Sequence, residues 1–425
     1  MTLQLGAIAI FIAVFVLATW RRVHLGIVML PVACAVGVWL AGMPLRDVVG
    51  GFPVSIMLLL AGVTYFFGIA QVNGTIDRLI EAVLTRVGDR AAALPLVFFA
   101  LTAGISTMGS PLAGLVMAPI GMPLAKRYGM DPMLMALAIG SGFSAGGFAP
   151  TSLFGIVTYG TAQQAGIALN PLTLLAVAAG ANLALLLAAF LLFGGPALLA
   201  RRRLPVVAPP PTSLPPAPGA FARNQVATLV AMLGLVAVVI GASLAGLEPD
   251  IGVLCLGFGA ALAFYDPRTG AAALSRIDWS TVLLVGGIVT YVGVLQKMGA
   301  VTMLGEAAGR IGAPILTALV ICAIGGLASA FASTTGILAV LVPLGIPLVA
   351  SGGVAGWALI SALAVCSSIV DVSPFSTVGA TLIASADEGE RPRVTSLLTR
   401  WGMALVVLGP LVLVLLLVLP ASMAR

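Results

Sequence analysis

The sequence predicts an all-α polytopic membrane protein made of two inverted-topology repeats, on the basis of its composition, its long apolar segments and an internal repeat. Of 425 residues, 60% are hydrophobic and only 8% are charged, whereas soluble domains contain ~25% charged residues. The 51 glycines and 27 prolines fit spanning helices, in which both residues are more frequent than in soluble helices. The composition therefore excludes a soluble fold.

The composition also excludes several kinds of active site and partner. With His24 as its single histidine, the chain cannot build a His-based zinc or haem site or a Ser-His-Asp triad. The four cysteines stand alone in apolar runs, and we interpret them as packing residues. The net charge of +6 comes from Lys and Arg scattered over short loops without interleaved aromatic residues, so we expect no nucleic-acid partner.

The amino-terminal repeat covers residues 1–200 and is predicted to cross the membrane five times. A spanning helix needs ~20 mostly apolar residues. Crossings are expected at 2–20, 24–42, 53–72, 131–165 and 171–200, and Gly, Ser, Thr and Pro break the one at 131–165. Residues 75–90 are apolar on one face and charged on the other, which predicts a helix on the membrane surface. Residues 91–126 are apolar but interrupted half-way, and we interpret them as a re-entrant hairpin.

Residues 201–223 are basic and proline-rich and are predicted to be a cytoplasmic linker. The carboxy-terminal repeat, residues 224–425, follows the same plan as the first. It has a surface helix near 300–311, a hairpin at 311–350 and a broken helix at 354–386. Its other crossings are expected at 223–246, 250–265, 279–296 and 401–420.

An offset of about 224 residues aligns the two halves. It places PIGMPL at 119–124 on PLGIPL at 343–348. The aligned pairs further include Gly68 and Gly293, Gln71 and Gln296, Gly74 and Gly299, Pro150 and Pro374, and Gly155 and Gly379. Because the predicted number of crossings in each copy is odd, the second copy is inserted upside down, which is the construction of secondary transporters.

The basic residues predict the orientation of the chain. If both hairpins enter and leave on one side, 16 of the 20 Lys and Arg fall on one side of the membrane. Only Arg46, Lys297, Arg310 and Arg425 fall on the other. Under the positive-inside rule the first side is cytoplasmic, so both termini are expected outside the cytoplasm.

Four non-helical segments are predicted within the apolar stretches: the hairpin tips 106–114 and 331–336, and the helix breaks 144–152 and 371–377. Irregular backbone at membrane depth occurs only where it is buried in protein or lines a cavity. The repeat places the four segments together near the midplane. Helix amino ends and hydroxyl groups there suit a carboxylate, and bare carbonyl oxygens suit Na+.

Asp371 is the only one of the 14 acidic residues that lies inside an apolar stretch. A carboxylate at that depth costs about 2.5 to 3.5 kcal/mol on the insertion scale, so it needs a cation or a hydrogen-bond partner. Either Asp371 couples transport to a cation or proton, or it caps the broken helix in an Asp-x-Ser arrangement with Ser373. Because no Lys or Arg lies in a core segment, we expect a transported dianion to find no fixed positive side chain and to depend on a co-bound cation.

The two hairpin tips share a pattern with a proline downstream. Ser333, Thr334 and Thr335 read STT, with Pro343 nine residues after Thr334. Gly109, Ser110 and Pro111 read GSP, with Pro119 nine residues after Ser110. With the order of elements over nearly the whole chain, these residues resemble the divalent anion:sodium symporter family of the ion transporter superfamily, whose tips read Ser-Asn-Thr. Within it, the chain is most similar to the bacterial dicarboxylate or malonate carrier branch (MatC type).

The resemblance implies sodium-coupled uptake of malonate, C4-dicarboxylates, citrate or related di- and tricarboxylates. It implies a homodimer in the lipid bilayer of the bacterial inner membrane, in which a hairpin domain moves against a scaffold like an elevator; H+ could replace Na+. The implied Na+ ligands are Ser106, Gly109, Ser110, Ser144, Gly146, Ser333, Thr334, Asp371 and Ser373. The implied substrate contacts are Ser110, Pro111, Thr151, Ser152, Thr334, Thr335, Pro374, Ser376 and Thr377.

Two other functions remain open from the residues alone. An exchanger for inorganic ions with the same fold, such as an Na+/H+ antiporter or an arsenite pump, would use Asp371 as its proton carrier. An intramembrane enzyme would need Ser110 or Ser333 as nucleophile, and the core segments hold no His or Lys to activate either serine. We therefore expect a transporter and no enzymatic activity.

Overall fold

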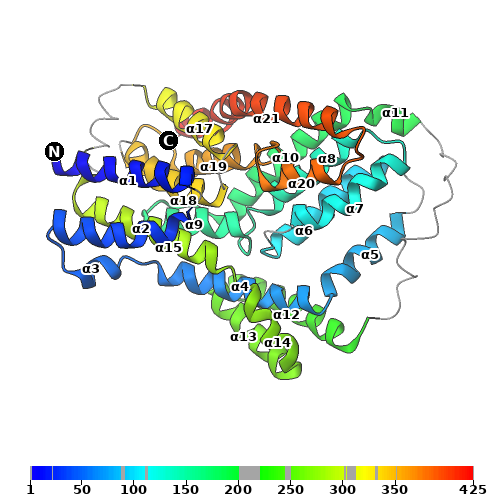
Figure 1. The fold of residues 1–425 in the computed structure, drawn as a ribbon, viewed down its shortest axis with the longest axis horizontal. Helices are drawn as coiled ribbons and strands as arrows, with labels where there is room; N and C mark the ends of the chain where they lie inside the picture. The colour runs from blue at the N-terminus through cyan, green and yellow to red at the C-terminus, as the bar shows by residue number, and fades with distance from the viewer. Residues whose placement is uncertain are drawn as a thin grey trace.

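The computed structural model of the chain is shown in Figure 1. It describes residues 2–21, 23–87, 91–110, 113–200, 221–244, 250–300, 303, 313–330, 334–350 and 352–424. Within these ranges the chain forms helices and no β-strand. The predicted all-α class is therefore confirmed for the described part of the chain.

The helices of the amino-terminal half follow the predicted order. They are α1 (Thr2–Arg21), α2 (Leu25–Ala35) with its π-helical continuation η1 (Val36–Leu40), α3 (Leu45–Val49), α4 (Val54–Val72), α5 (Thr75–Val87), η2 (Ala91–Ala93), α6 (Leu94–Thr107), α7 (Ala113–Arg127), α8 (Pro132–Gly146), α9 (Leu153–Gln164), α10 (Pro171–Leu192) and α11 (Gly195–Ala200). Asp131 and Asn170 start α8 and α10 because each side chain accepts a hydrogen bond from the N–H two residues later, and a proline follows each of them.

The carboxy-terminal half repeats this order. Its helices are α12 (Arg223–Leu244), α13 (Ile251–Tyr265), α14 (Pro267–Ala273), η3 (Leu274–Arg276), α15 (Trp279–Lys297), α17 (Pro314–Ser329), α18 (Thr334–Ala350), α19 (Gly356–Ser368), α20 (Thr377–Ser385), α21 (Arg391–Leu413), η4 (Val414–Val418) and α22 (Leu419–Met423). Asp250 and Asp278 cap α13 and α15 with their carboxylates.

The predicted hairpins and broken helices correspond to pairs of helices. Residues 91–126 form α6 and α7, and residues 131–165 form α8 and α9. Residues 75–90 contain α5, which buries Ile76 and Ile80 and contacts α4, α6 and α12. The crossing expected at 171–200 is shorter than predicted: α10 ends at Leu192 because Gly194 adopts a φ of +82°, and α11 follows as a separate helix.

Two predicted segments lie largely outside the described residues. Of the linker at 201–223, the structure describes only the last three residues, and of the surface helix near 300–311 only residues 300 and 303.

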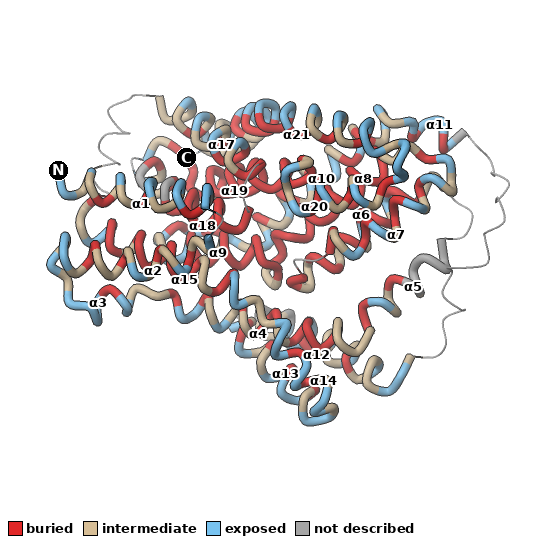
Figure 2. The backbone as a smooth tube through the Cα atoms, in the orientation of Figure 1, coloured by how far each residue is buried: buried red, intermediate tan, exposed pale blue. Residues whose placement is uncertain are grey.

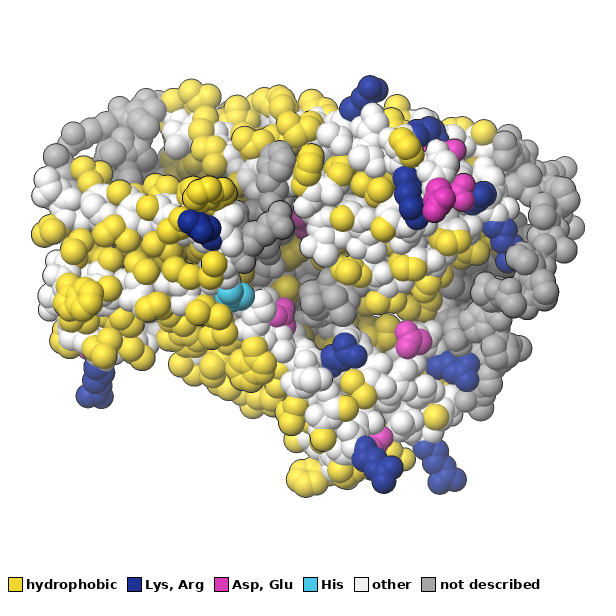
Figure 3. Space-filling view, viewed as in Figure 1, with side chains coloured by type: hydrophobic (Ala, Val, Ile, Leu, Met, Phe, Trp, Pro, Cys, Tyr) yellow, Lys and Arg dark blue, Asp and Glu magenta, His cyan; other side chains and the backbone are white. Residues whose placement is uncertain are grey.

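Several helices have the length and apolarity of membrane spans. Within the described ranges, α4, α10, α15 and the continuous helix Arg391–Met423 are each long and apolar enough to cross a bilayer. Large apolar side chains are exposed on α1, α10, α12 and α21, where lipid can cover them. On the face in Figure 3, Lys and Arg gather toward α11, α14 and α20, and the opposite end carries few of them. These features describe a multi-pass membrane protein.

Helices of one half pack against helices of the other half. α2 packs on α15, and α4 packs on α13. Both crossings are close because glycines face backbone: a Cβ on Gly26 would lie 2.1 Å from the Leu283 carbonyl oxygen, and one on Gly62 would lie 2.3 Å from that of Gly252. The predicted hairpins also pack against the other half: α7 packs on α20, and α18 packs on α9.

The core is centred on two helices, α8 and α19. Every residue of α8 from Met133 to Gly146 is buried, and so is every residue of α19 except Trp357. A helix that is apolar on all sides is stable only inside a protein or membrane. Figure 2 shows the buried backbone concentrated around these two helices, with exposed backbone on the outer ones. The carboxyl ends of α8 and α19 lead directly into the two predicted helix breaks.

Candidate functional site

The first hairpin tip is joined to the first helix break by hydroxyl groups. Ser106, at the end of α6, is buried and donates a hydrogen bond of 2.9 Å to the carbonyl oxygen of Phe143. Thr151 donates from the break to the carbonyl oxygen of Thr107. Ser152, at the start of α9, is buried and donates to the Gly147 carbonyl oxygen over 2.7 Å. Tip and break therefore form one polar, oxygen-rich region in the core.

The second hairpin tip is joined to the second helix break in a similar way, but through a carboxylate. Thr334 Oγ1 donates to Asp371 Oδ1 over 2.5 Å and lies 2.8 Å from Ser329 Oγ. Ser373 donates to the carbonyl oxygen of Ala330 over 2.9 Å. All four side chains are buried, and Asp371 is only 8% exposed. Among the described residues, no Lys or Arg pairs with this carboxylate.

The two helices that lead into the breaks, α8 and α19, meet through a pair of serines. Ser144 Oγ lies 2.7 Å from Ser368 Oγ, and these residues are 224 positions apart, the offset that aligns the two halves. Asn182 of α10 also donates to Ser144, over 3.1 Å, while its own Oδ1 is buried without a hydrogen-bond partner. The structure therefore joins each tip to its own break, and it joins the carboxyl ends of α8 and α19 to each other.

The remaining predicted site residues lie in different surroundings. Thr335 is buried, Pro374 and Ser376 are half-buried, and Thr377 is exposed. A Cβ on Gly146 would lie 2.1 Å from the Ala103 carbonyl oxygen, so this glycine lets α8 approach α6. Pro111 and Ser333 lie outside the described residues.

In the structure, Asp371 does not cap the helix that follows the break, α20. Ser376 is the amino-terminal cap of α20, and its Oγ accepts a hydrogen bond of 2.9 Å from the N–H of Gly379. The Asp371 carboxylate accepts instead from Thr334 on the hairpin tip. The Asp-x-Ser interpretation was wrong because the break runs three residues beyond Ser373 before α20 begins.

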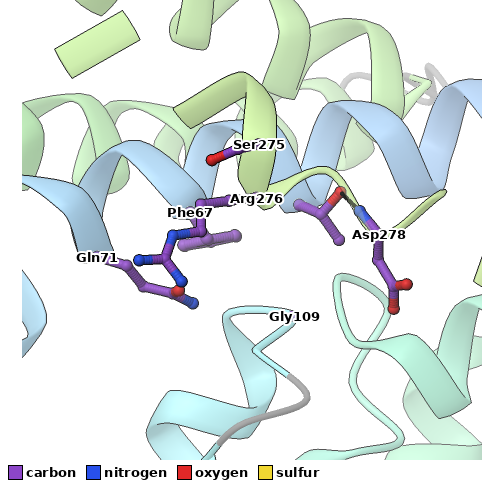
Figure 4. Close-up of a pocket in the computed structure, with 7 residues that line it drawn as sticks. Phe67, Gln71, Gly109, Ser275, Arg276 and Asp278 are labelled. Atoms are coloured by element: carbon purple, nitrogen blue, oxygen red, sulfur yellow. Dashed lines mark hydrogen bonds between the residues drawn. The ribbon is translucent and has the colours of Figure 1, made fainter. Parts of the chain in front are cut away.

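A pocket of about 240 Å³ adjoins the first hairpin tip. Thr64, Phe67 and Gln71 of α4 line one side, Gly109 of the tip lies opposite, and Ser275 and Arg276 of η3 complete the wall with Asp278. Figure 4 shows the Arg276 and Gln71 side chains directed into the same space, which faces the loop at Gly109. Gln71 Nε2 also donates to Ser110 Oγ over 3.1 Å, so the pocket is continuous with the predicted site.

Arg276 corrects the expectation that a dianion finds no fixed positive side chain near the tips. The sequence places Arg276 in a short loop, which gives no measure of its distance from α4. In the fold, Gly68 lets η3 approach, because a Cβ on Gly68 would lie 2.8 Å from Arg276 Cβ. The sequence signal was indirect: Gly68 and Gln71 both belong to the aligned positions of the repeat.

A second pocket of about 240 Å³ lies against the second hairpin. Val289, Val292 and Gln296 of α15 line it together with Gly51 and with Pro343 and Ile346 of α18. Gln296 is the repeat partner of Gln71, and at the same offset Gly51 takes the place of Arg276. Lys297 also lines this pocket, where its Nζ donates to the Asp47 carbonyl oxygen over 3.2 Å.

Neither pocket nor the tips hold a metal centre of the His or Cys type. No cluster of three or more His, Cys, Asp or Glu occurs in the described part of the chain. Cys255, Cys322 and Cys366 are buried and unbridged, and Cys34 is half-buried and unbridged. The donors at the tips are oxygen atoms, the kind that alkali and alkaline-earth cations prefer.

Comparison with known proteins supports a transport protein. Residues 1–147 match the family described as "Dicarboxylate carrier protein MatC N-terminus", which confirms the predicted resemblance to MatC-type carriers over this part of the chain. No curated protein matches the sequence. The YdaH transporter of Alcanivorax borkumensis has a similar fold, with a TM-score of 0.53 and 15% identity over 87% of this chain and 86% of that chain. Both similarities are to transporters and not to enzymes.

Proposed function

We propose that the protein is a secondary active transporter that imports small di- or tricarboxylates together with a cation, Na+ or H+. The observation that carries this proposal is the buried contact between Thr334 and Asp371. It places an acidic group between a hairpin tip and a helix break, where no described basic side chain neutralises it. A carboxylate in such surroundings must bind a proton or a cation. The match of residues 1–147 to a dicarboxylate carrier family supports an anionic substrate.

The donor sets at the two tips fit a cation in different ways. Around the second tip, Asp371, Thr334, Ser329, Ser373 and the Ala330 carbonyl supply oxygen atoms and one negative charge. Around the first tip, Ser106, Ser110 and Ser144 supply neutral oxygen atoms only. Na+ held at either place would offset the charge of a bound carboxylate, because the hydroxyls and helix ends carry only partial charges.

The movement that we propose is an elevator movement of the tips and breaks against the remaining helices. The moving unit would contain α6 to α11 and α17 to α22, and the scaffold would contain α1 to α4 with α12 to α15. The exchange of partners between the halves supports an inverted repeat: α2 with α15 repeats α4 with α13, and α7 with α20 repeats α18 with α9. Ser144 and Ser368, which are repeat partners in contact, would lie on the pseudo-two-fold axis.

The orientation that we propose places both termini in the periplasm of the bacterial inner membrane. In Figure 1 the two termini lie near one another, at the end opposite α11. The gathered Lys and Arg side chains lie toward the α11 end (Figure 3), which the positive-inside rule assigns to the cytoplasm. The homodimer remains a proposal from the family resemblance, and cross-linking in membranes tests it.

Uptake into proteoliposomes tests the function directly. Labelled malonate, succinate and citrate are offered with an inward Na+ gradient, with an inward H+ gradient and with neither. We expect accumulation of at least one of them only when a cation gradient is present. Equal uptake with and without both gradients would overturn the coupling, and no uptake or binding of any carboxylate would overturn the substrate class.

A second candidate is an inorganic ion exchanger with Asp371 as proton carrier, which the isolation of this buried acid favours. The same proteoliposomes distinguish it from the symporter. With a pH-sensitive dye inside and no carboxylate present, an exchanger acidifies or alkalinises the lumen when Na+ or arsenite is added outside. The symporter proposed here leaves the internal pH unchanged under these conditions.

A further inference from the structure

The pocket beside the first hairpin tip is lined by a positively charged side chain, Arg276, whereas the tips themselves carry none. Arg276 is in η3, outside the hairpin and the broken helices, yet its side chain shares the pocket with Gln71 and with Gly109 of the tip (Figure 4). Gln71 in turn donates to Ser110. A guanidinium is therefore placed beside a hydroxyl-bearing tip, at the boundary between the proposed moving unit and the proposed scaffold.

Arg276 is available to bind an anion. Its guanidinium forms no ion pair or hydrogen bond with any residue that the structure describes. The nearby acid, Asp278, is already engaged: its carboxylate accepts from the Thr281 N–H over 3.0 Å and from Thr281 Oγ1 over 2.7 Å. The lining of the pocket thus keeps one basic group uncompensated, while its acidic group serves to cap α15.

The position of Arg276 is fixed by the backbone around it. Gly68 allows η3 to lie against α4, where any larger residue would meet Arg276 Cβ. The N–H of Asp278 donates to Thr64 Oγ1 over 3.3 Å, which ties the next turn to the same helix. These contacts hold the start of the Arg276 side chain at the pocket wall, and the rest of the side chain is directed into the pocket (Figure 4).

The repeat supplies an internal comparison. The pocket at the second hairpin keeps the glutamine, Gln296, but has Gly51 at the position of Arg276. Its Lys297 already donates to the Asp47 carbonyl oxygen. The guanidinium is therefore specific to the first pocket, and Arg276 belongs to a predicted cytoplasmic loop.

We propose that Arg276, with Gln71, forms a carboxylate subsite that holds one carboxylate of a dicarboxylate at the cytoplasmic mouth of the first hairpin tip. This inference rests on the proposed function, because the ligand is the transported substrate. A guanidinium binds a carboxylate with two parallel hydrogen bonds, and an amide N–H adds a third donor. The second pocket has Gly51 in place of Arg276 and so holds no guanidinium among its lining residues, and we expect the affinity for the substrate to differ between the two faces of the membrane.

The test measures dicarboxylate affinity on each face separately. Wild type, Arg276→Gln and Arg276→Lys are reconstituted, and the half-saturation concentration for succinate is measured for each orientation, which is selected with a membrane-impermeant blocker. Arg268→Gln is the matched control, because Arg268 is an exposed arginine on neighbouring α14 that does not line the pocket. Thermal unfolding without succinate shows whether each variant folds.

We expect Arg276→Gln to raise the half-saturation concentration on the cytoplasmic face about tenfold, the effect of losing a hydrogen bond to a charged group. Arg276→Lys should restore part of it, and Arg268→Gln should change it by less than about twofold. An unchanged value for a folded Arg276→Gln, or an equal change on both faces, would overturn the subsite while leaving the symporter intact. Absence of succinate, malonate and citrate transport in the wild type would instead overturn the proposed function.

Discussion

The two tip-and-break regions are joined by similar hydrogen bonds but differ in charge. In the amino-terminal half, Ser106 and Thr151 donate hydrogen bonds to main-chain carbonyls. In the carboxy-terminal half, Thr334 donates to the carboxylate of Asp371, and Gly147 occupies the position of that acid in the first half. Hydrogen bonds between tip and break thus occur in both halves, whereas the acidic residue occurs only in the second. The difference teaches that aligned positions of the two halves can differ in charge, and we therefore expect the two regions to differ in their affinity for a cation.

The largest expected effect comes from removing the carboxylate that distinguishes the halves. Asp371→Asn keeps the size of the side chain and an acceptor for Thr334 but removes the negative charge. We expect cation-dependent uptake to fall at least about tenfold, which corresponds to ~1.4 kcal/mol of lost cation binding. Uptake in proteoliposomes measures this, with Glu388→Gln as control because Glu388 is an exposed acid far along the chain from the tips.

Unchanged cation-dependent uptake in a folded Asp371→Asn protein would show that the negative charge of Asp371 does not couple transport to the cation. The converse variant sharpens the comparison: Gly147→Asp places an acid at the aligned position of the first half. A Cβ on Gly147 would lie 2.6 Å from the Phe154 ring, which must shift, so thermal unfolding first establishes that this variant folds. A gain of cation dependence there would show that the first region can hold a cation in the same geometry.

The next effect tests whether the two halves are equivalent in backbone. A Cβ on Gly155 would lie 2.1 Å from the Ala149 carbonyl oxygen, and one on Gly379 would lie 1.9 Å from that of Ser373. Gly155→Ala and Gly379→Ala should therefore each destabilise the protein by ~1 to 3 kcal/mol, because the helix start must move away from the break. Thermal unfolding in detergent compares them, with Gly180→Ala as control since a Cβ there meets nothing within 4 Å. A loss confined to one variant would contradict the equivalence.

A smaller effect is expected from the hydroxyl groups at the tips. Thr334→Ala removes the donor to Asp371, and Ser110→Ala removes the group bonded to Gln71. We expect Thr334→Ala to raise the apparent Na+ constant and Ser110→Ala to raise the apparent substrate constant, each about threefold to tenfold. Initial uptake rates over a range of Na+ and succinate measure both. If neither constant changes in either variant, the tips are not the binding region; Thr334→Ser should behave like the wild type.

The smallest effect concerns the end of the molecule where the halves are tied by charge. Asp131 caps α8 and pairs with Arg393 over 2.6 Å, while the cap position of α19 is held by Ala355, which has no side-chain cap. Asp131→Ala should cost ~1 to 2 kcal/mol, mostly from the lost cap. Arg393→Gln removes the ion pair and keeps the cap, so it should cost less than ~1 kcal/mol, and thermal unfolding separates the two. A greater loss for Arg393→Gln would assign the stability to the ion pair.

The sequence anticipated the helical parts of this fold because their signal is local. Apolar length identifies α4, α10 and α15, and a Gly, Ser and Pro cluster marks each break in a helix. The repeat predicted that the tips and breaks lie close together, and in the structure each tip contacts its own break. The end of α10 at Leu192 was missed because a positive φ at Gly194 has no signature distinct from the other glycines of the chain.

The site was less accessible to sequence reasoning because its polar groups come from separate elements. Asn182 is one polar residue in an apolar helix, and nothing local shows that it faces Ser144. Arg276 is the last residue of η3, directly after α14, and only the close packing at Gly68 brings it to the first tip. Asp371 was visible as a buried acid, and the family resemblance grouped it with Thr334 as an implied Na+ ligand, whereas the direct hydrogen bond between the two side chains was not predicted.

By itself, the sequence determined that this is an all-helical membrane protein in which irregular, hydroxyl-rich segments interrupt the apolar helices. Such features depend on composition and on spacing along the chain, which hydrophobicity and backbone hydrogen bonding convert directly into helices and breaks. Only the tertiary structure decided which groups face one another: Ser144 with Ser368, Thr334 with Asp371, and Arg276 with the first tip. Distances between elements are set by side-chain size at their crossings, and a glycine such as Gly68 or Gly26 shows its effect only when a neighbouring backbone lies against it.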